Sequence, residues 1–82
     1  MANILFFGRL GDQFGRAVDV ELPGAGCTIG ALRALLIETL EGAEDILRQK
    51  SVRACVDQQI VSDNAFVRAG QEIAFLPPLS GG

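Results

Sequence analysis

Only one segment of this chain has the length and spacing of a main helix, and that limits what the rest can form. Residues 28–40, TIGALRALLIETL, place four leucines on one face at helical spacing: Leu32, Leu35, Leu36 and Leu40. Thr28 is suited to cap the first turn, and Gly42 follows where helices commonly end. A single helix of this kind covers one face of a sheet and leaves the other face to something else.

The remaining apolar segments are short and have the patterns of strands. A continuous apolar run predicts a strand buried on both sides, and alternation predicts a half-buried strand. The predicted strands are residues 3–8, 17–22, 52–57, a short extended piece at 59–61, and 72–77, which Pro77 ends. The Gly-rich residues 8–16 are predicted to be a connection, and residues 43–50 to add a short helical turn.

This order predicts an α+β protein with the ubiquitin-like β-grasp fold. We expect a mixed sheet of four to five strands packed on one main helix. The first and last strands are the most apolar, so they should lie centrally, and 82 residues are enough for one domain. We therefore divide the chain into a β-grasp domain, residues 1–76, and an extended C-terminal Gly-Gly tail, residues 77–82.

The charged residues and the lack of histidine exclude several functions. The net charge is −3 and the cations are scattered, so we expect no nucleic-acid partner. No apolar run is long enough to span a membrane and no signal peptide is visible, which predicts a cytoplasmic protein. The sequence has no His and no zinc-type Cys cluster, so we predict no metal site and no catalytic site of its own.

The two cysteines and the glycines near the helix have ordinary structural interpretations. Cys55 lies in an apolar run and is predicted to be a buried small hydrophobe, and Cys27 to be a neutral residue at the helix boundary. Gly24 and Gly26 resemble part of a dinucleotide fingerprint, but Ile29 stands where its third glycine belongs. We interpret both glycines as turn residues.

The end of the chain, FLPPLSGG, has features of an inserted arm. Pro77 and Pro78 favour a stiff, extended exit from the sheet, and Leu79 and Ser80 continue the arm. Gly81 and Gly82 have no side chains, so they form a tip narrow enough to enter a tunnel in another protein. An ordinary frayed terminus is the alternative.

Three segments together resemble the small subunit of molybdopterin synthase, a ubiquitin-like sulfur carrier. They are FFGRLGDQFG near the start, the helix at 28–40, and VDQQIVSDNAFVRAGQEIAFLPPLSGG at the end. The Pro-Pro before Gly-Gly separates this pattern from the shorter carriers of the thiazole pathway. Asp57 departs from it, since the family often has Asn there.

The resemblance implies a non-catalytic sulfur donor in molybdenum cofactor biosynthesis. An E1-like adenylating enzyme would use ATP and Mg²⁺ to activate the Gly82 carboxylate, and a sulfurtransferase would convert it to a thiocarboxylate. The carrier would then join the catalytic large subunit, in a heterotetramer of two small and two large subunits, and give sulfur to cyclic pyranopterin monophosphate to form the dithiolene. No permanently bound cofactor is implied.

The sheet face away from the helix is the second candidate site. The first and last predicted strands are apolar on both faces, which is typical of a surface that a partner covers. The resemblance places Phe7, Ile60 and Leu76 at this partner surface. Alternatively, the loops at 9–16 and 63–70 fold over that face.

Three other functions stay open at this point. They are a sulfur carrier for another acceptor, such as thiazole, a ubiquitin-like modifier that forms isopeptide bonds, and a passive binding domain with an incidental Gly-Gly. Lys50, the single lysine, limits chain building by a modifier on itself.

Overall fold

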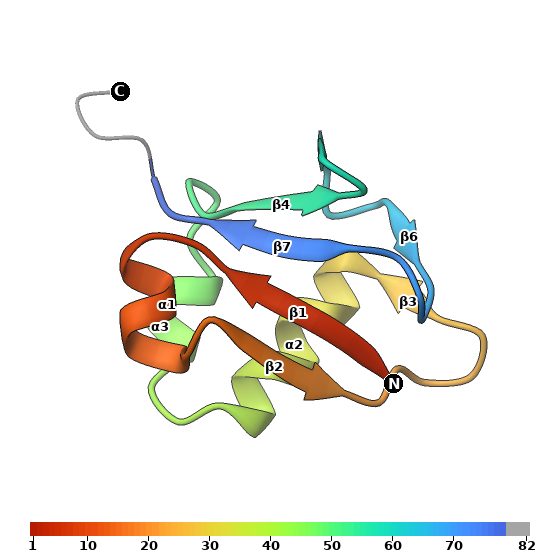
Figure 1. Cartoon of the computed structure of the whole chain (residues 1–82), viewed down its shortest axis with the longest axis horizontal. Helices are drawn as coiled ribbons and strands as arrows, with labels where there is room; N and C mark the ends of the chain where they lie inside the picture. The colour runs from red at the N-terminus through yellow and green to blue at the C-terminus, as the bar shows by residue number, and fades with distance from the viewer. Residues whose placement is uncertain (79–82) are drawn as a thin grey trace.

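A five-stranded mixed sheet and one main helix form the body of the chain in its computed structural model, which describes residues 1–78 (Figure 1). The elements in chain order are β1 (Ala2–Phe6), α1 (Arg9–Phe14), β2 (Ala17–Val20), β3 (Cys27–Thr28), α2 (Ile29–Thr39), α3 (Glu44–Leu47), β4 (Arg53–Val56), β5 (Gln59–Val61), β6 (Phe66–Val67) and β7 (Ile73–Leu76). The sheet has the order β2-β1-β7-β4-β5. Strands β1 and β7 are parallel, and the other neighbours are antiparallel.

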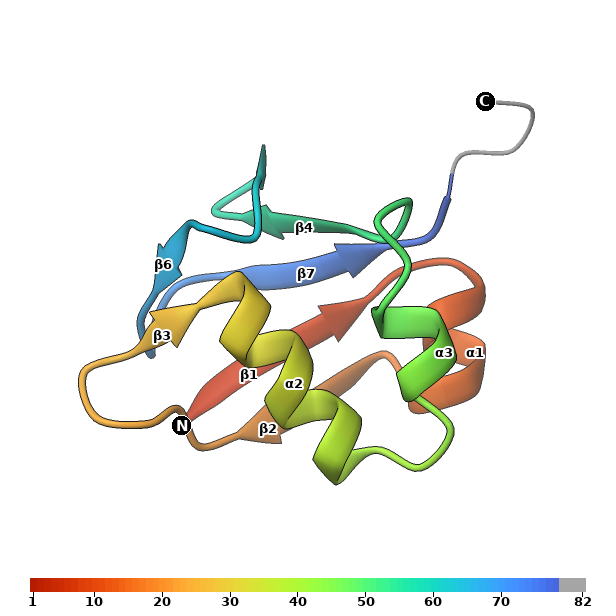
Figure 2. The same cartoon turned by 180° about the vertical axis from the view of Figure 1, so that it is seen from behind.

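This arrangement confirms the predicted ubiquitin-like β-grasp fold. The last strand, β7, lies at the centre of the sheet with β1 beside it, as their apolar sequences predicted. Helix α2 crosses the back of the sheet (Figure 2), and the side chain of Thr28 accepts a hydrogen bond from the backbone N–H of Ala31, 3.1 Å away. Within residues 1–78, no helix has both the length and the apolar character that crossing a membrane requires.

Two local elements differ from the sequence-based expectation. The segment predicted as a connection, residues 8–16, contains helix α1. Tertiary packing explains this helix, because Leu10 is buried and the ring of Phe14 lies 5.3 Å from that of Phe6, measured between centroids. Strands β3 and β6, which were not predicted, pair as a separate two-stranded sheet.

Gly26 allows the two-stranded sheet to form so close to the preceding turn. Its φ is 138°, and a Cβ at this position would collide with the carbonyl oxygen of Val67. Gly24 also has a positive φ, of 51°. The prediction that Gly24 and Gly26 are turn residues is thus confirmed, and the backbone conformation of Gly26 is one that only glycine adopts readily.

The core lies between α2 and the inner face of the sheet. Leu32 and Leu36 are fully buried, whereas Leu35 and Leu40 are half-buried and pack against the border of the core. The sheet contributes alternate residues of its central strands: Ala2, Ile4, Phe6, Ala54, Val56, Ile73 and Phe75. The predicted leucine face of the helix is therefore the core-facing one, with two of its four leucines at the centre.

Shortening Leu36 should destabilise the domain strongly, because its side chain is fully buried among core residues. We expect Leu36→Ala to lower the free energy of unfolding by about 2–5 kcal/mol. Chemical denaturation followed by circular dichroism measures this loss. Leu35→Ala, in the same helix but half-buried, is the control and should lose clearly less; equal losses would show that Leu36 is not at the centre of the core.

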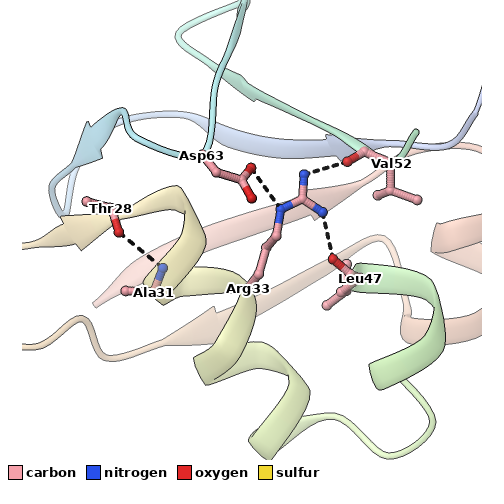
Figure 3. A network of polar contacts seen from close by, with 6 residues as sticks. All are labelled: Thr28, Ala31, Arg33, Leu47, Val52 and Asp63. Carbon is pink, nitrogen blue, oxygen red and sulfur yellow. Dashed lines mark hydrogen bonds and ion pairs between the residues drawn. The ribbon is translucent and has the colours of Figure 1, made fainter. Parts of the chain in front are cut away.

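A buried arginine fastens α2 to two loops (Figure 3). The guanidinium of Arg33 donates hydrogen bonds to the carbonyl oxygens of Leu47, 2.7 Å away, and Val52, 2.5 Å away. Its Nε lies 3.1 Å from Oδ1 of Asp63, and its charge lies over the ring of Phe75, 5.3 Å from the centroid. Arg33 therefore fixes both ends of the segment between α3 and β4 and holds the loop after β5.

Candidate functional site

The predicted tail leaves the body from the central strand of the sheet. Strand β7 ends at Leu76, and Pro77 and Pro78 follow, half-buried and exposed respectively. The predicted tip, Leu79 to Gly82, lies outside the described residues, so the interpretation of these four positions stays a prediction.

The base of the tail is packed against the loop that follows β1. The backbone N–H of Phe7 donates to the carbonyl oxygen of Phe75, 3.1 Å away, which continues the β1–β7 ladder by one residue. A Cβ on Gly8, whose φ is 57°, would lie 2.9 Å from Cγ of Pro77. The close approach of Gly8 to Pro77 therefore gives the first residue of the tail a defined place on the body.

The sheet face opposite α2 is apolar across its middle. Strand register places Leu5 opposite Ala74, Ala74 opposite Cys55, and Cys55 opposite Ile60, so these four residues form one row across four strands. Leu76, two residues after Ala74, lies on the same side of β7, and Phe7 follows Leu5 in the same way. We call these six residues the apolar face: Leu5, Phe7, Cys55, Ile60, Ala74 and Leu76.

The three partner-contact residues predicted from the sequence all belong to the apolar face. Phe7 is 46% exposed and Ile60 is 57% exposed, whereas Leu76 is half-buried. Such exposure of large apolar side chains on one side of a sheet is typical of an interaction surface. Their assignment to a partner stays a prediction, but the structure brings them to one side of the sheet.

The alternative, that loops fold over this face, is wrong for the described residues. The segment at 9–16 packs through Leu10 and Phe14 on the side of Phe6, which is the core side. In the segment at 63–70, Val67 is buried in the same core. Figure 1 looks onto the sheet from the side away from α2, which lies behind the strands, and α1 lies at the end of β1 and not across the strands.

Cys55 was predicted to be a buried hydrophobe, and the structure corrects this. Its side chain is half-exposed on the apolar face, because β4 directs Ala54 and Val56 toward the core and Cys55 to the opposite side. The alternation of Val52, Ala54 and Val56 in the sequence contained the signal that could have placed Cys55 on the outer side. Leu5 is half-buried on the same face and was likewise not named as a contact residue, whereas Ala74 lies in the same row but is buried.

The other candidate chemical groups have structural roles. Burial raises the pKa of the Cys27 thiol, so its reactive thiolate form is disfavoured at neutral pH, and it packs in the core. Asp57 accepts hydrogen bonds from the backbone N–H of Glu72 at 3.0 Å and from the side chain of Gln71 at 3.2 Å. It thereby ties the β4–β5 turn to the start of β7, and it uses both carboxylate oxygens, whereas an Asn has one oxygen and could keep only one of the two bonds in this geometry.

Nothing in residues 1–78 forms a cluster of three or more His, Cys, Asp or Glu side chains that could hold a metal ion.

Comparison with known proteins agrees with this geometry. The sequence model of the ThiS family matches residues 4–82. The crystal structure of SAMP1 from Haloferax volcanii superposes with a TM-score of 0.71 at 27% sequence identity, covering 99% of this chain and 98% of that one. A putative molybdopterin converting factor, subunit 1, from Pyrococcus furiosus has the same fold, with a TM-score of 0.78 at 19% identity and coverage of 95% and 97%. This chain belongs to the ThiS family of small ubiquitin-like carrier and modifier proteins.

Proposed function

We propose that the chain is the sulfur-carrier subunit of a molybdopterin synthase. In this proposal the Gly82 carboxylate is adenylated, converted to a thiocarboxylate, and used as the sulfur donor for the dithiolene of molybdopterin. The observation that carries the proposal is the position of the tail: the central strand β7 runs into Pro77 and Pro78 at the border of an uncovered apolar face. The Pro-Pro-Leu-Ser-Gly-Gly sequence favours this acceptor over thiazole.

The residues of this chain present the reacting group and do not catalyse. Pro77, packed against Gly8, directs the arm, and Leu79 and Ser80 extend it toward the partner. Gly81 leaves the terminal carbonyl accessible from both sides because it has no side chain. ATP and Mg²⁺ belong to the adenylating partner, which would form the acyl-adenylate and release pyrophosphate. A thiocarboxylate is ionised at neutral pH, so its sulfur is a good nucleophile.

Three protein partners follow from the proposal. An E1-like enzyme adenylates the carrier, a sulfurtransferase provides the sulfur, and the large subunit of the synthase receives the charged tail. The two small and two large subunits of the synthase would form a heterotetramer, and the large subunit would contribute the catalytic groups. The reaction sequence begins with adenylation by ATP, which is available in the cytoplasm. We therefore place the chain in the cytoplasm.

A second candidate function is protein modification. The observation that favours it is the likeness to SAMP1 from Haloferax volcanii and to a further crystal structure described as H. volcanii small archaeal modifier protein 1, which superposes with a TM-score of 0.68 at 25% identity. In that role the activated Gly82 would react with a lysine amine of a target protein. Thiocarboxylate formation and isopeptide formation share the adenylation step. The two functions are therefore distinguished by the product that forms after this step.

Intact-mass spectrometry after incubation with the adenylating enzyme, ATP, a persulfide donor and a thiol reductant tests the proposal. The persulfide displaces AMP to give an acyl disulfide, and the reductant cleaves its S–S bond to release the thiocarboxylate. Sulfur carriage predicts a mass gain equal to the replacement of one oxygen by one sulfur. Conjugation to a target adds the mass of a whole protein, and a passive domain stays unchanged. Adding the large subunit and the pterin precursor to the charged carrier, and then looking for molybdopterin, separates this acceptor from thiazole.

The apolar face should be needed for docking. We expect Phe7→Ala or Leu76→Ala to weaken binding to the large subunit by more than about 1 kcal/mol, because buried apolar anchors dominate such interfaces. Titration calorimetry measures the affinity, and a melt shows that each variant stays folded. Phe66→Ala is the matched control: Phe66 is 51% exposed but lies on β6, outside the apolar face. Wild-type affinity in Phe7→Ala and Leu76→Ala would exclude this face from the interface.

A further inference from the structure

A depression beside the edge strand β5 gathers three of the six exposed cationic side chains of residues 1–78. It has a volume of about 390 Å³ and lies between β5, the start of β4 and the segment that follows α3. Four cationic side chains line it together with a single carboxylate: Arg33, Arg48, Lys50, Arg53 and Asp63. This is unexpected in a chain whose net charge is −3.

The ion pairs within this group of side chains do not neutralise its exposed positive charge. Arg33 and Asp63 pair with each other, so the carboxylate is already matched. Arg48 pairs with Glu44 at 3.0 Å, but both side chains are more than 60% exposed, and pairs of this kind contribute little and exchange easily. Lys50 and Arg53 are exposed and form no ion pair with any residue in 1–78.

The buried side chain of Arg33 fixes the backbone segment that carries these cations. The two hydrogen bonds from Arg33 to the carbonyl oxygens of Leu47 and Val52 hold both ends of residues 48–51 (Figure 3). Arg48 and Lys50 are on this segment, and Arg53 follows it as the first residue of β4. A fixed backbone lowers the conformational cost of presenting charge to a partner.

The same cations lie next to the apolar face and to the start of the tail. Arg53 is directly opposite Leu76 in the β4–β7 register, one residue before Pro77. Ile60, a member of the apolar face, also lines the depression. A protein that covers the apolar face and receives the tail would therefore meet Lys50 and Arg53 at the border of its contact.

We propose that Arg48, Lys50 and Arg53, the cationic flank, dock an acidic patch on the adenylating enzyme. The inference rests on the proposed function, because it assumes that this enzyme takes up the tail across the apolar face. Complementary charge at the border of an interface raises the association rate and fixes orientation. The carrier is acidic, so an acidic partner repels most of its surface. The same partner attracts the cationic flank, which turns the end of the carrier that holds the tail toward it.

Charge reversal within and outside the flank tests the inference. Lys50→Glu and Arg53→Glu are compared with Arg68→Glu, an exposed arginine just after β6 that changes the net charge by the same amount. The dissociation constant for the adenylating enzyme of the same organism is measured by fluorescence anisotropy, without ATP. We expect the two flank variants to bind at least about 10-fold more weakly at low ionic strength, and Arg68→Glu to change affinity less than about 2-fold.

The salt dependence of binding and a charge-conserving variant show whether weaker binding comes from lost charge or from a disturbed fold. The affinity gap should narrow between about 0.05 M and about 0.5 M NaCl, because the screening length shortens over this range. Lys50→Arg should retain wild-type affinity, since it keeps the charge. Equal weakening in Arg68→Glu, a gap that persists in high salt, or loss of affinity in Lys50→Arg would each overturn the flank as an electrostatic docking site.

The binding assay also separates this inference from the proposed function. If the wild-type chain binds the enzyme but gains no sulfur when ATP, a persulfide donor and a thiol reductant are added, sulfur carriage is wrong. The affinities of the variants for the enzyme still test the cationic flank in that case. Inorganic triphosphate is titrated separately by calorimetry, and we expect no saturable binding. Saturable binding that disappears in Arg53→Glu would assign the depression to a phosphate ligand and overturn the acidic partner.

Discussion

Adding a single alanine after Gly82 is expected to abolish sulfur loading completely and to leave the domain folded. The physical reason is that the extra residue turns the Gly82 carboxylate into a peptide bond, which cannot attack ATP. The new terminal carboxylate is one residue farther out and has a Cβ beside it. Intact-mass spectrometry after incubation with the adenylating enzyme, ATP, a persulfide donor and a thiol reductant measures the result, and a thermal melt checks the fold.

The control for this experiment keeps the length of the tail. Gly81→Ala should fold normally and still be charged, but more slowly, because a Cβ crowds the narrow site that the tip enters. Sulfur loading of the extended chain at the wild-type rate would rule out the Gly82 carboxylate as the reacting group. Wild-type rates in Gly81→Ala would show that the partner's site is wider than the two glycines suggest.

The sheet and the main helix could be predicted because their patterns are local and repeat. Alternation places Val18 and Val20 on one side of β2, and leucine spacing defines the inner face of α2. The continuous apolar sequences of β1 and β7 predicted that these strands lie centrally, and they are neighbours in the sheet. In each case the residues that specify an element lie within it.

The elements that were missed depend on contacts between distant residues. Helix α1 lies between Gly8 and Gly15 and contains Gly11, and these residues favour a loop when considered alone. It forms because Leu10 and Phe14 find partners in the core, which a short window of sequence does not reveal. Strands β3 and β6 contain two residues each, too few for a period to be visible.

Some residues of the candidate site could likewise be identified from the sequence, and others only from the structure. Phe7, Ile60 and Leu76 were identified through resemblance, and the register of four strands is what places them on one surface with Cys55. The cationic flank was not named as a site from the sequence, although Arg48, Lys50 and Arg53 lie within six residues of one another there. The sequence does not reveal that Arg33 anchors this segment through hydrogen bonds to the backbone carbonyls of residues 47 and 52, because a carbonyl has no sequence signature.

Replacing Arg33 with alanine should destabilise the domain about as much as losing a core leucine. The change leaves the carbonyl oxygens of Leu47 and Val52 without their donors, and removes the charge from above the ring of Phe75. Each unsatisfied buried polar group costs about 1–3 kcal/mol. We therefore expect the free energy of unfolding to fall by about 2–5 kcal/mol, measured by chemical denaturation.

Two further variants show which contact of Arg33 matters most. Arg48→Ala removes an exposed arginine from the same region and should change stability by less than about 1 kcal/mol, because its ion pair with Glu44 faces solvent. Asp63→Asn keeps an acceptor for Nε and should cost much less than Arg33→Ala, since Asp63 is 57% exposed in the pair. A loss in Asp63→Asn as large as that in Arg33→Ala would mean that the ion pair, and not the two carbonyl bonds, holds α2 to the segment carrying Arg48 and Lys50.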